Sequence, residues 1–484
     1  MRSLASTRIL VGLAAVGLTA TGLTTVARSA TSAPVPSTAA TPSAACGTGS
    51  LPEATQGRAP ASDVASGRYA MGYTCNAQQV AHVGKAGGYR VERYVDGAGH
   101  ECAFADSTLL YPSNLPEQQT EGPGTYVYDM KDPAHPVLST TLVTPAMQSP
   151  HESLRLNVKR GLLVADMAYP TTNPGIVDVY DVKANCLQPV LKSSTPLGVL
   201  GHEGGFSPDG NTFWVASLYA HTLAAVDLTN PSVPSVVFFS ANYQAHGVSI
   251  SNDGNRLYMA EAALDKTRGD FSGLTVLDIS QVQNRVLAPT VPIVSRLTWP
   301  QVSTPQNATP FTRGGHRYLL ETDEFGSGAS IGASRIIDIQ DETHPYVVSN
   351  IRLAVNQAAA QGPDLEADPG NDQAFQGYQG HYCSLPSRVD PNTIACNFIM
   401  SGLRVFDITT PSKPREIAYF NKPILKGSDV DPLKAGAFAM SAPAYDETTG
   451  DIWYTDGNSG FYVVRMTGIA AQRPFASTVL LPGN

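Results

Sequence analysis

Short runs of β-branched and aromatic residues recur along the chain from residue 124 onwards, and most of them end in aspartate. Several copies are followed by a turn bracketed by two prolines, such as DPAHP at 132–136 and DETHP at 341–345. Proline cannot donate a hydrogen bond to a β-ladder, so each such turn predicts the end of one strand and the start of another. The seven copies end at Asp129, Asp181, Asp227, Asp278, Asp338, Asp407 and, with the aspartate replaced, Arg465. The six aspartates are expected to accept hydrogen bonds from the turn that follows.

These ends lie 46 to 69 residues apart, and each interval has room for about four short strands. Four strands in each of seven units predict an all-β fold, a single seven-bladed β-propeller of four-stranded blades over residues 70–484. A solenoid is the competing architecture, but its repeats are usually shorter and more uniform. We expect the last residues, STVLLPGN, to pair with N-terminal residues and close the ring.

The repeated apolar run with its aspartate and proline turn resembles the LVIVD-repeat family of secreted bacterial proteins. The resemblance covers about residues 70–466. It implies a secreted β-propeller and says little about chemistry, because activities in that family are largely unassigned.

The N-terminus has the pattern of an export signal. Arg2 and Arg8 bracket a short basic region, an apolar run follows over residues 9–26, and small residues come next. We therefore predict a signal peptide at 1–30 and a secreted, extracellular protein. Residues 31–69 are expected to be a disordered lead-in and N-terminal segment, because residues 31–45 are Ala, Ser, Thr and Pro. No later segment is apolar enough to predict a membrane span in the mature chain.

Composition narrows the class of protein further. Only 15% of the 484 residues are charged, while Gly (43) and Pro (36) are abundant, which favours strands and turns over long helices. The net charge of −9 argues against a nucleic-acid partner.

An exported chain favours disulfides over free thiols. Six cysteines allow fifteen pairings, so spacing alone does not settle them. Cys383 and Cys396 flank a turn almost symmetrically, which predicts that they face each other in a hairpin. Cys75 with Cys102 is the second predicted pair, and this leaves Cys46 for Cys186.

Four units begin with histidine when they are aligned without gaps, as in HEGGFSPDGNTFWVAS from His202. Asn307 and a serine, Ser441, take the same position in two other units. The innermost strand of each blade lines the central channel, so equivalent residues are predicted to converge on one small volume. Side-chain alternation predicts that Glu152 and Glu203, which follow two of these histidines, face away. The four histidines are His151, His202, His246 and His381.

The histidine ring has two interpretations. Convergent neutral imidazoles are good ligands for a transition metal ion in the central channel, and carotenoid oxygenases and selenium-binding propellers also place histidines near a metal. Alternatively, each imidazole hydrogen-bonds the neighbouring blade or a ligand and serves packing alone. Acidic residues recur fifteen positions after the histidine position and either orient the imidazoles or cap nearby turns. They are Asp166, Glu261 and Asp456, with Glu321 nearby in the fifth unit.

Most of these sequence signals come from the repeats, and repeats specify architecture and not chemistry. The sequence therefore favours a monomeric binding or interaction module for an unknown protein, glycan or small molecule. The alternative is a metal-dependent enzyme, an oxidoreductase or hydrolase, that uses the histidines. A third possibility is a propeller lyase or lactonase, which would need a cation bound by carboxylates instead.

Overall fold

The structure, a computed structural model, describes residues 36–108, 122–168, 173–263, 270–326, 331–372, 376–426, 435–473 and 475–476. The predicted signal peptide at 1–30 lies outside them. The described residues belong to one compact unit, Val35–Asn484.

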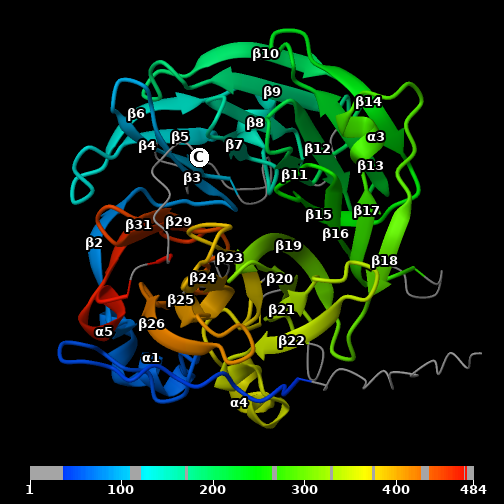
Figure 1. The fold of residues 1–484 in the computed structure, drawn as a ribbon. Coiled ribbons are helices and arrows are strands. Elements are labelled where there is room, and N and C mark those ends of the chain that lie inside the picture. The colour runs from blue at the N-terminus through cyan, green and yellow to red at the C-terminus, as the bar shows by residue number, and fades with distance from the viewer. Residues whose placement is uncertain are drawn as a thin grey trace, which may run out of the picture. The chain divides into compact units, whose positions relative to one another are not determined.

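Seven antiparallel sheets form a ring, which confirms the seven-bladed β-propeller (Figure 1). The first four blades each contain four strands in chain order from the channel outwards. Blade 1 comprises β3 (Val91–Val95), β4 (Glu101–Asp106), β5 (Thr125–Asp129) and β6 (Val137–Leu142). Blade 2 comprises β7 (Arg155–Asn157), β8 (Leu162–Asp166), β9 (Ile176–Asp181) and β10 (Val190–Pro196). Blade 3 comprises β11 (Glu203–Phe206), β12 (Thr212–Ser217), β13 (Thr222–Asp227) and β14 (Ser235–Ser240). Blade 4 comprises β15 (Ala245–Ile250), β16 (Arg256–Glu261), β17 (Gly273–Asp278) and β18 (Ile293–Leu297).

The last three blades differ in how they use strands from the N-terminus. Blade 5 comprises β19 (Thr304–Arg313), β20 (His316–Glu324), β21 (Ser334–Asp338) and β22 (Tyr346–Ile351). Blade 6 comprises β23 (Gly380–Ser384), β24 (Thr393–Phe398), β25 (Gly402–Asp407) and β26 (Arg415–Asn421), with β1 (Tyr73–Cys75) as a fifth strand. Blade 7 comprises β29 (Ala444–Asp446), β30 (Asp451–Asp456), β31 (Gly460–Met466) and β2 (Ala77–Val83). A separate small ribbon pairs β27 (Leu425–Lys426) with β28 (Ala435–Gly436).

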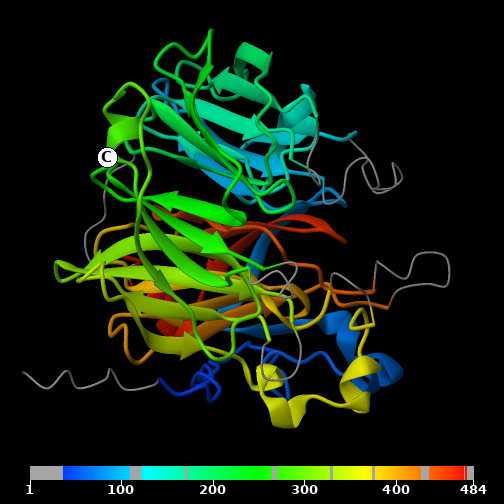
Figure 2. The same ribbon diagram turned by 90° about the vertical axis from the view of Figure 1, so that its right-hand side faces the viewer.

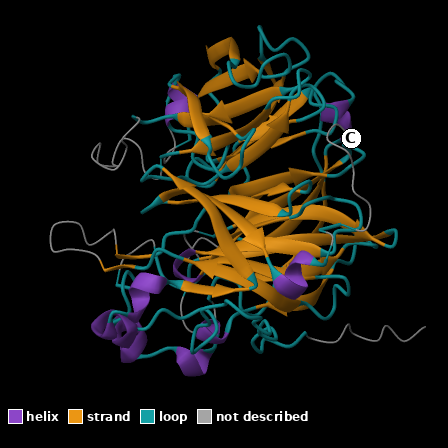
Figure 3. Ribbon diagram, turned by 90° about the vertical axis from the view of Figure 1, so that its left-hand side faces the viewer, coloured by secondary structure: helices purple, strands orange, loops and turns teal. Residues whose placement is uncertain are grey.

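Helices are short, and several of them lie at the edge of the molecule, outside the strands (Figures 2 and 3). Within the described ranges, no helix is long and apolar enough to cross a membrane. The α-helices are α1 (Ala61–Ser66), α2 (Pro145–Gln148), α3 (Ser280–Gln283), α4 (Pro363–Glu366) and α5 (Gly468–Ala471). The 3₁₀ helices are η1 (Arg68–Met71), η5 (Ala354–Asn356), η6 (Ala358–Ala360) and η7 (Ile399–Ser401).

The ring closes through β2, which pairs with β31 from Ala77 opposite Met466 to Val83 opposite Phe461. An N-terminal strand therefore becomes the outermost strand of the last blade, and the pairing covers an edge that β31 would otherwise expose. Residues 477–484 were predicted to close the ring by pairing with N-terminal residues, and they lie outside the described residues.

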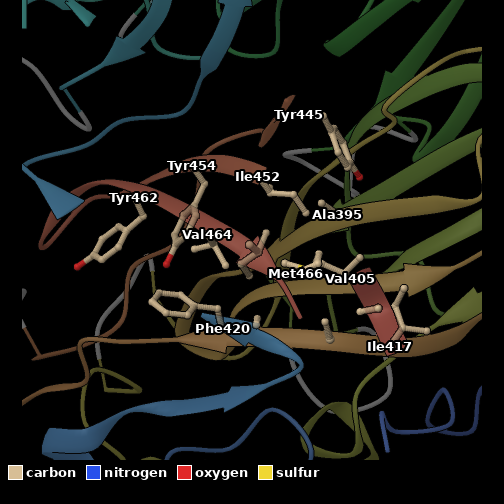
Figure 4. Close-up of a cluster of buried hydrophobic side chains, with 14 of the residues drawn as sticks. Ala395, Val405, Ile417, Phe420, Tyr445, Ile452, Tyr454, Tyr462, Val464 and Met466 are labelled. Atoms are coloured by element: carbon tan, nitrogen blue, oxygen red, sulfur yellow. The ribbon is translucent and has the colours of Figure 1, made fainter. Parts of the chain in front are cut away.

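Apolar side chains fill the space between neighbouring blades. Both faces of a middle strand are covered, so β8 is buried at every position instead of alternating. Between blades 6 and 7, Phe420 packs against Tyr454 and Tyr462 (Figure 4). Each such large side chain contributes about 1.5–3 kcal/mol by leaving water, and the seven interfaces together hold the innermost strands in place.

The six repeat aspartates act as predicted. In each copy a carboxylate oxygen accepts a hydrogen bond from the backbone N–H two residues later, at 2.9 to 3.0 Å. In the copy that lacks aspartate, Arg465 instead pairs with Asp451 through two contacts of 2.7 Å. The repeat is therefore a turn-forming signal and not a ligand site.

Residues 36–45 differ from the predicted disorder, because they run with the rest of the N-terminal segment along blades 5 and 6 (dark blue in Figure 1). The N–H of Thr41 donates to the carbonyl of Arg352 at 2.8 Å. Further on, Glu53 pairs with the fully buried Arg404, at 2.6 Å. The composition contains too little apolar surface to predict packing, but backbone hydrogen bonds and a buried guanidinium that needs anionic partners hold the segment.

Three disulfides join all six cysteines. Cys383 and Cys396 are bonded and lie directly opposite each other in the β23–β24 ladder, as the hairpin prediction requires. The other two predicted pairs are wrong: Cys46 bonds Cys75, and Cys102 bonds Cys186. The reason is topological, since β1 carries Cys75 to blade 6 whereas β4 carries Cys102 in blade 1.

Candidate metal centre

The four aligned histidines lie together at one end of the channel, where the innermost strands begin. The rings of His151 and His202 are 4.3 Å apart between centroids, and those of His202 and His246 are 4.9 Å apart. Tyr89 completes the circle, with its ring stacked on His151 at 4.3 Å and tilted towards His381 at 5.5 Å. The convergence predicted from the repeat is therefore present in the fold.

β-Bulges set the direction of two of these histidine side chains. The ladder register shifts across His246 in β15 and across His381 in β23, so each histidine is the extra residue of a bulge. A bulge bends the strand and redirects the side chain that it leaves out of the pairing. In β19 the corresponding shift lies across Gln306. Gln306, and not the aligned Asn307, is therefore the structural equivalent of the histidines in blade 5.

Glu152 lies among the histidines, contrary to the prediction that it faces away. Its Oε2 is 3.2 Å from Nε2 of His202, and its Oε1 is 3.3 Å from Nε2 of His381. The alternation rule fails because the preceding His151 has a φ of 49°, in the left-handed region, so the backbone is not a regular strand there. A positive φ at a residue other than glycine carries no signal in the sequence.

Glu324 is a second carboxylate that the sequence analysis missed. It ends β20, where its Oε2 lies 3.1 Å from Nε2 of His381 and its Oε1 lies 3.5 Å from Nε2 of His246. The acidic residue singled out in this blade was Glu321, which pairs instead with Arg335. The bulge in β19 shifts the hairpin register, and an ungapped alignment cannot detect such a shift.

Backbone carbonyl groups of neighbouring blades fix the orientation of two imidazoles. Nδ1 of His246 lies 2.8 Å from the carbonyl of Pro305, and Nδ1 of His381 lies 2.6 Å from the carbonyl of Met440. A carbonyl only accepts, so in each ring Nδ1 carries the hydrogen, and in the neutral ring the lone pair is on Nε2. Each Nε2 therefore either donates its hydrogen to a carboxylate or, in the neutral ring, has a lone pair that could bind a metal beside the carboxylates.

All six residues are buried, none being more than 7% exposed. Burial alone would lower the pKa of His381, but its hydrogen bonds with Glu152 and Glu324 raise it to about 9. Burial lowers the pKa of His246 and, further, that of His151. The two carboxylates therefore hold a proton on His381, and a cation is the alternative countercharge.

The three acidic residues expected behind the histidines have separate surroundings. Glu261 accepts from the hydroxyl of Thr275, and Asp456 accepts from the N–H of Phe438 at 2.7 Å. Asp166 lies against Gly201, beside a histidine, and burial raises its pKa well above the usual range. Thus Asp456 accepts from backbone N–H groups, as the capping alternative expects, whereas Glu261 holds a side chain of the facing strand.

An ion-pair layer connects the centre to the rest of the channel. Glu203 lies between Arg90 and Arg155, at 3.0 Å from the Arg90 guanidinium, and accepts from the amide of Asn307 at 2.6 Å. Burial raises the pKa of Glu203 to about 7, although both arginines oppose the shift. The Nε of Arg90 also donates to the carbonyl of Glu152 at 3.0 Å, which braces the residue at the middle of the centre.

A cavity of about 470 Å³ occupies the channel on the other side of this layer. Arg90, Arg155 and Asn307 line it together with Arg388. Arg388 donates to the carbonyl of Ile250 at 2.8 Å, and burial together with the charge of Arg155 lowers its pKa to about 10. The cavity therefore gathers positive charge in a confined space.

Solved structures with a similar fold have little sequence in common with this chain. They include a chain of hydrazine synthase from Kuenenia stuttgartiensis, with 13% identity, a TM-score of 0.39, and coverage of 65% of this chain and 74% of that chain. A chain of the mitotic checkpoint complex has 8% identity, a TM-score of 0.48, and coverage of 81% and 91%. A functionally unknown protein from Desulfotomaculum acetoxidans DSM 771 has 11% identity, a TM-score of 0.43, and coverage of 69% and 89%.

Neither a protein-family model nor a curated protein matches the chain. The comparisons show a resemblance to distant propellers and carry no argument about activity. Any statement about function therefore has to come from the side chains in the channel.

Proposed function

We propose that this protein binds a transition metal ion on the propeller axis and is a metal-dependent enzyme. The observation that carries the proposal is the convergence of four buried histidines and two buried carboxylates from five different blade regions. Burying so many ionisable groups costs free energy unless they are paired or bind a cation. Such a cluster is unnecessary for closing a propeller, because the interfaces between blades already supply the apolar core.

The donor set fits a metal. Donors bonded to one ion at about 2.1 Å lie roughly 3.0–3.4 Å apart in octahedral or tetrahedral geometry. Three of the nitrogen–oxygen separations lie in this range: 3.2 Å from His202 to Glu152, 3.3 Å from His381 to Glu152, and 3.1 Å from His381 to Glu324. Mixed imidazole and carboxylate donors suit zinc, manganese and iron better than soft ions such as copper(I).

The residues around the centre support catalysis more than storage of an ion. A bound metal supplies a Lewis acid and lowers the pKa of bound water, which suits hydrolysis, whereas a redox-active metal suits an oxidoreductase. Around it, Tyr89 stacks on His151, and Tyr219 meets His202 edge-on with a ring separation of 5.5 Å. Tyr219 is 52% exposed, so the centre lies close to a surface that solutes reach.

Metal analysis of the full chain, exported so that its disulfides form, tests the proposal. We expect near-stoichiometric zinc, manganese or iron after dialysis, and loss of most of it in a His246→Ala/His381→Ala variant. The matched control is His135→Ala/His344→Ala, because these two histidines are 80% and 83% exposed in proline turns. The control should keep its metal.

A wild-type protein that stays metal-free after incubation with each of the three ions would overturn the proposal. Equal metal contents in the two double variants would overturn it as well, because binding would then be adventitious. Thermal melting of both variants shows whether each one is folded.

The arginine-lined cavity favours a second candidate, a binding module for a small anionic molecule. Guanidinium groups bind carboxylates and phosphates in bidentate geometry, and Arg388 has no carboxylate partner among the described residues. Calorimetric titration with inorganic phosphate tests this candidate. We expect phosphate to bind, and Arg388→Gln to weaken this binding by roughly tenfold. Unchanged binding in that variant would exclude the cavity as the phosphate-binding site.

The setting that we propose is a secreted, monomeric protein of the LVIVD-repeat kind. The repeat supports the family, and the three disulfides support an oxidising compartment. Fractionation of the native host, followed by mass spectrometry of the N-terminus, tests both export and cleavage after residue 30.

A further inference from the structure

We infer that the centre holds two metal ions, bridged by the carboxylates of Glu152 and Glu324. The inference rests on the proposed function and specifies how many ions that same site takes. It comes from the way in which the four carboxylate oxygens are divided among the four imidazoles.

The two oxygens of Glu152 face different pairs of histidines. Its Oε2 lies 3.2 Å from Nε2 of His202 and 3.8 Å from Nε2 of His246. Its Oε1 lies 3.3 Å from Nε2 of His381 and 3.9 Å from Nδ1 of His151. One carboxylate therefore stands between two groups of nitrogen donors.

Glu324 repeats this division. Its Oε1 lies 3.5 Å from Nε2 of His246, and its Oε2 lies 3.1 Å from Nε2 of His381. Each half of the centre thus receives one oxygen from each glutamate. The first half adds His202 and His246, and the second adds His381, while His151 forms a group with Glu152 and His202.

One ion cannot use all of these donors. With bonds of about 2.1 Å, two ligands of one ion lie at most about 4.2 Å apart, on opposite sides of it. Two groups of three donors each fit within 4.8 Å, His151–Glu152–His202 and Glu152–Glu324–His381, and Glu152 belongs to both. Carboxylates that bind one ion through each oxygen hold two ions at the separation of two-metal sites, about 3.5–4 Å.

The charge of a two-ion centre predicts the kind of molecule that binds there. Two carboxylates and four neutral imidazoles carry a charge of −2, so two divalent ions leave the centre at +2. Glu203, a further carboxylate that follows His202, is already paired with Arg90 and Arg155. A buried excess of positive charge favours an anionic oxygen ligand, so the substrate class is an oxyanion such as a phosphate ester or a carboxylate.

Manganese loading of the full-length exported protein tests the ion count. Mn²⁺ is used alone, with elemental analysis after gel filtration and electron paramagnetic resonance of the loaded protein. We expect two ions per chain and the broad multiline signal of an exchange-coupled pair. Glu324→Gln, which is neutral and has one oxygen donor, should hold one ion and show an uncoupled six-line spectrum.

One ion per wild-type chain at saturating Mn²⁺, with an uncoupled spectrum, would overturn the two-ion centre and leave the proposed function intact. No bound ion at all would overturn both. Glu324→Asp is the second variant in case Glu324→Gln does not fold, and it should restore the coupled spectrum because it keeps two oxygens. An exposed-site control, His344→Ala, should match the wild type.

Discussion

Removing the metal should give the protein a stability that falls as the solution becomes alkaline, and His381 is the main cause. Its hydrogen bonds with Glu152 and Glu324 raise its pKa to about 9, against about 6.5 in an unfolded chain. Between these two values the folded protein keeps a proton that the unfolded protein releases. The stabilisation is therefore complete below pH 6.5 and is lost as the pH rises through about 9.

The size of the effect follows from the difference between the two pKa values. One unit corresponds to 1.36 kcal/mol, so a shift from 6.5 to about 9 gives a loss of about 3 kcal/mol across this range. His246, whose pKa burial lowers, contributes the opposite slope, but only below pH 6.5. Burial raises the pKa values of Glu203 and Asp106 to about 7, so the stabilisation from their protons is lost mainly below pH 7, and the loss above pH 7 reports His381.

Urea unfolding in the presence of EDTA, at pH values from 5.5 to 9.5, measures this profile. Trp214 and Trp453 are fully buried, so tryptophan fluorescence reports the loss of tertiary structure. The variant His381→Gln should lose most of the slope above pH 7. The control His344→Ala removes an exposed histidine and should keep it.

A wild-type free energy of unfolding that stays constant within about 1 kcal/mol from pH 6.5 to 9 would refute the reasoning. The reasoning would also be refuted if the free energy of unfolding of His381→Gln fell with pH as steeply as that of the wild type. Saturating metal should remove the alkaline loss, because metal binding displaces the proton and strengthens as imidazoles deprotonate.

Three other changes should alter stability without touching the centre. Replacing Cys102 and Cys186 by alanine opens a link across 84 residues and should lower the free energy of unfolding by about 4.5 kcal/mol, measured by urea unfolding. Arg404→Met leaves two buried carboxylates without their cation and should cost about 3–5 kcal/mol in the same assay; a neutral result would mean that the N-terminal segment detaches. Asp129→Ala removes one turn hydrogen bond and should cost about 1 kcal/mol by thermal melting, and a loss above 3 would contradict a purely local role.

Much of the site follows from the repeat. Because equivalent residues of a propeller lie at one height around one axis, aligning the repeats placed His202 beside His246 without any knowledge of coordinates. The aspartate of each copy, such as Asp181, could be assigned to its turn because the hydrogen bond spans only two residues. Interactions of this kind involve residues that are close in the chain, so they can be recognised from the sequence.

The rest of the site depends on backbone geometry that sequence patterns do not encode. Glu152 reaches the centre because His151 adopts a positive φ, and Glu324 does so because of a bulge in the facing strand. Neither feature changes the pattern of apolar and polar residues. Both carboxylates were therefore missed, although both lie within 3.3 Å of a histidine nitrogen.

The sequence by itself determined seven blades, four histidine positions and the hairpin disulfide, because each depends on contacts within a repeat or on the symmetry of the ring. Only the tertiary structure decided which carboxylates join the histidines, how β2 closes the ring, and that Cys46 bonds Cys75. These features depend on contacts between blades that are distant in sequence. Such contacts are set by packing of the whole ring, and no short stretch of residues specifies them.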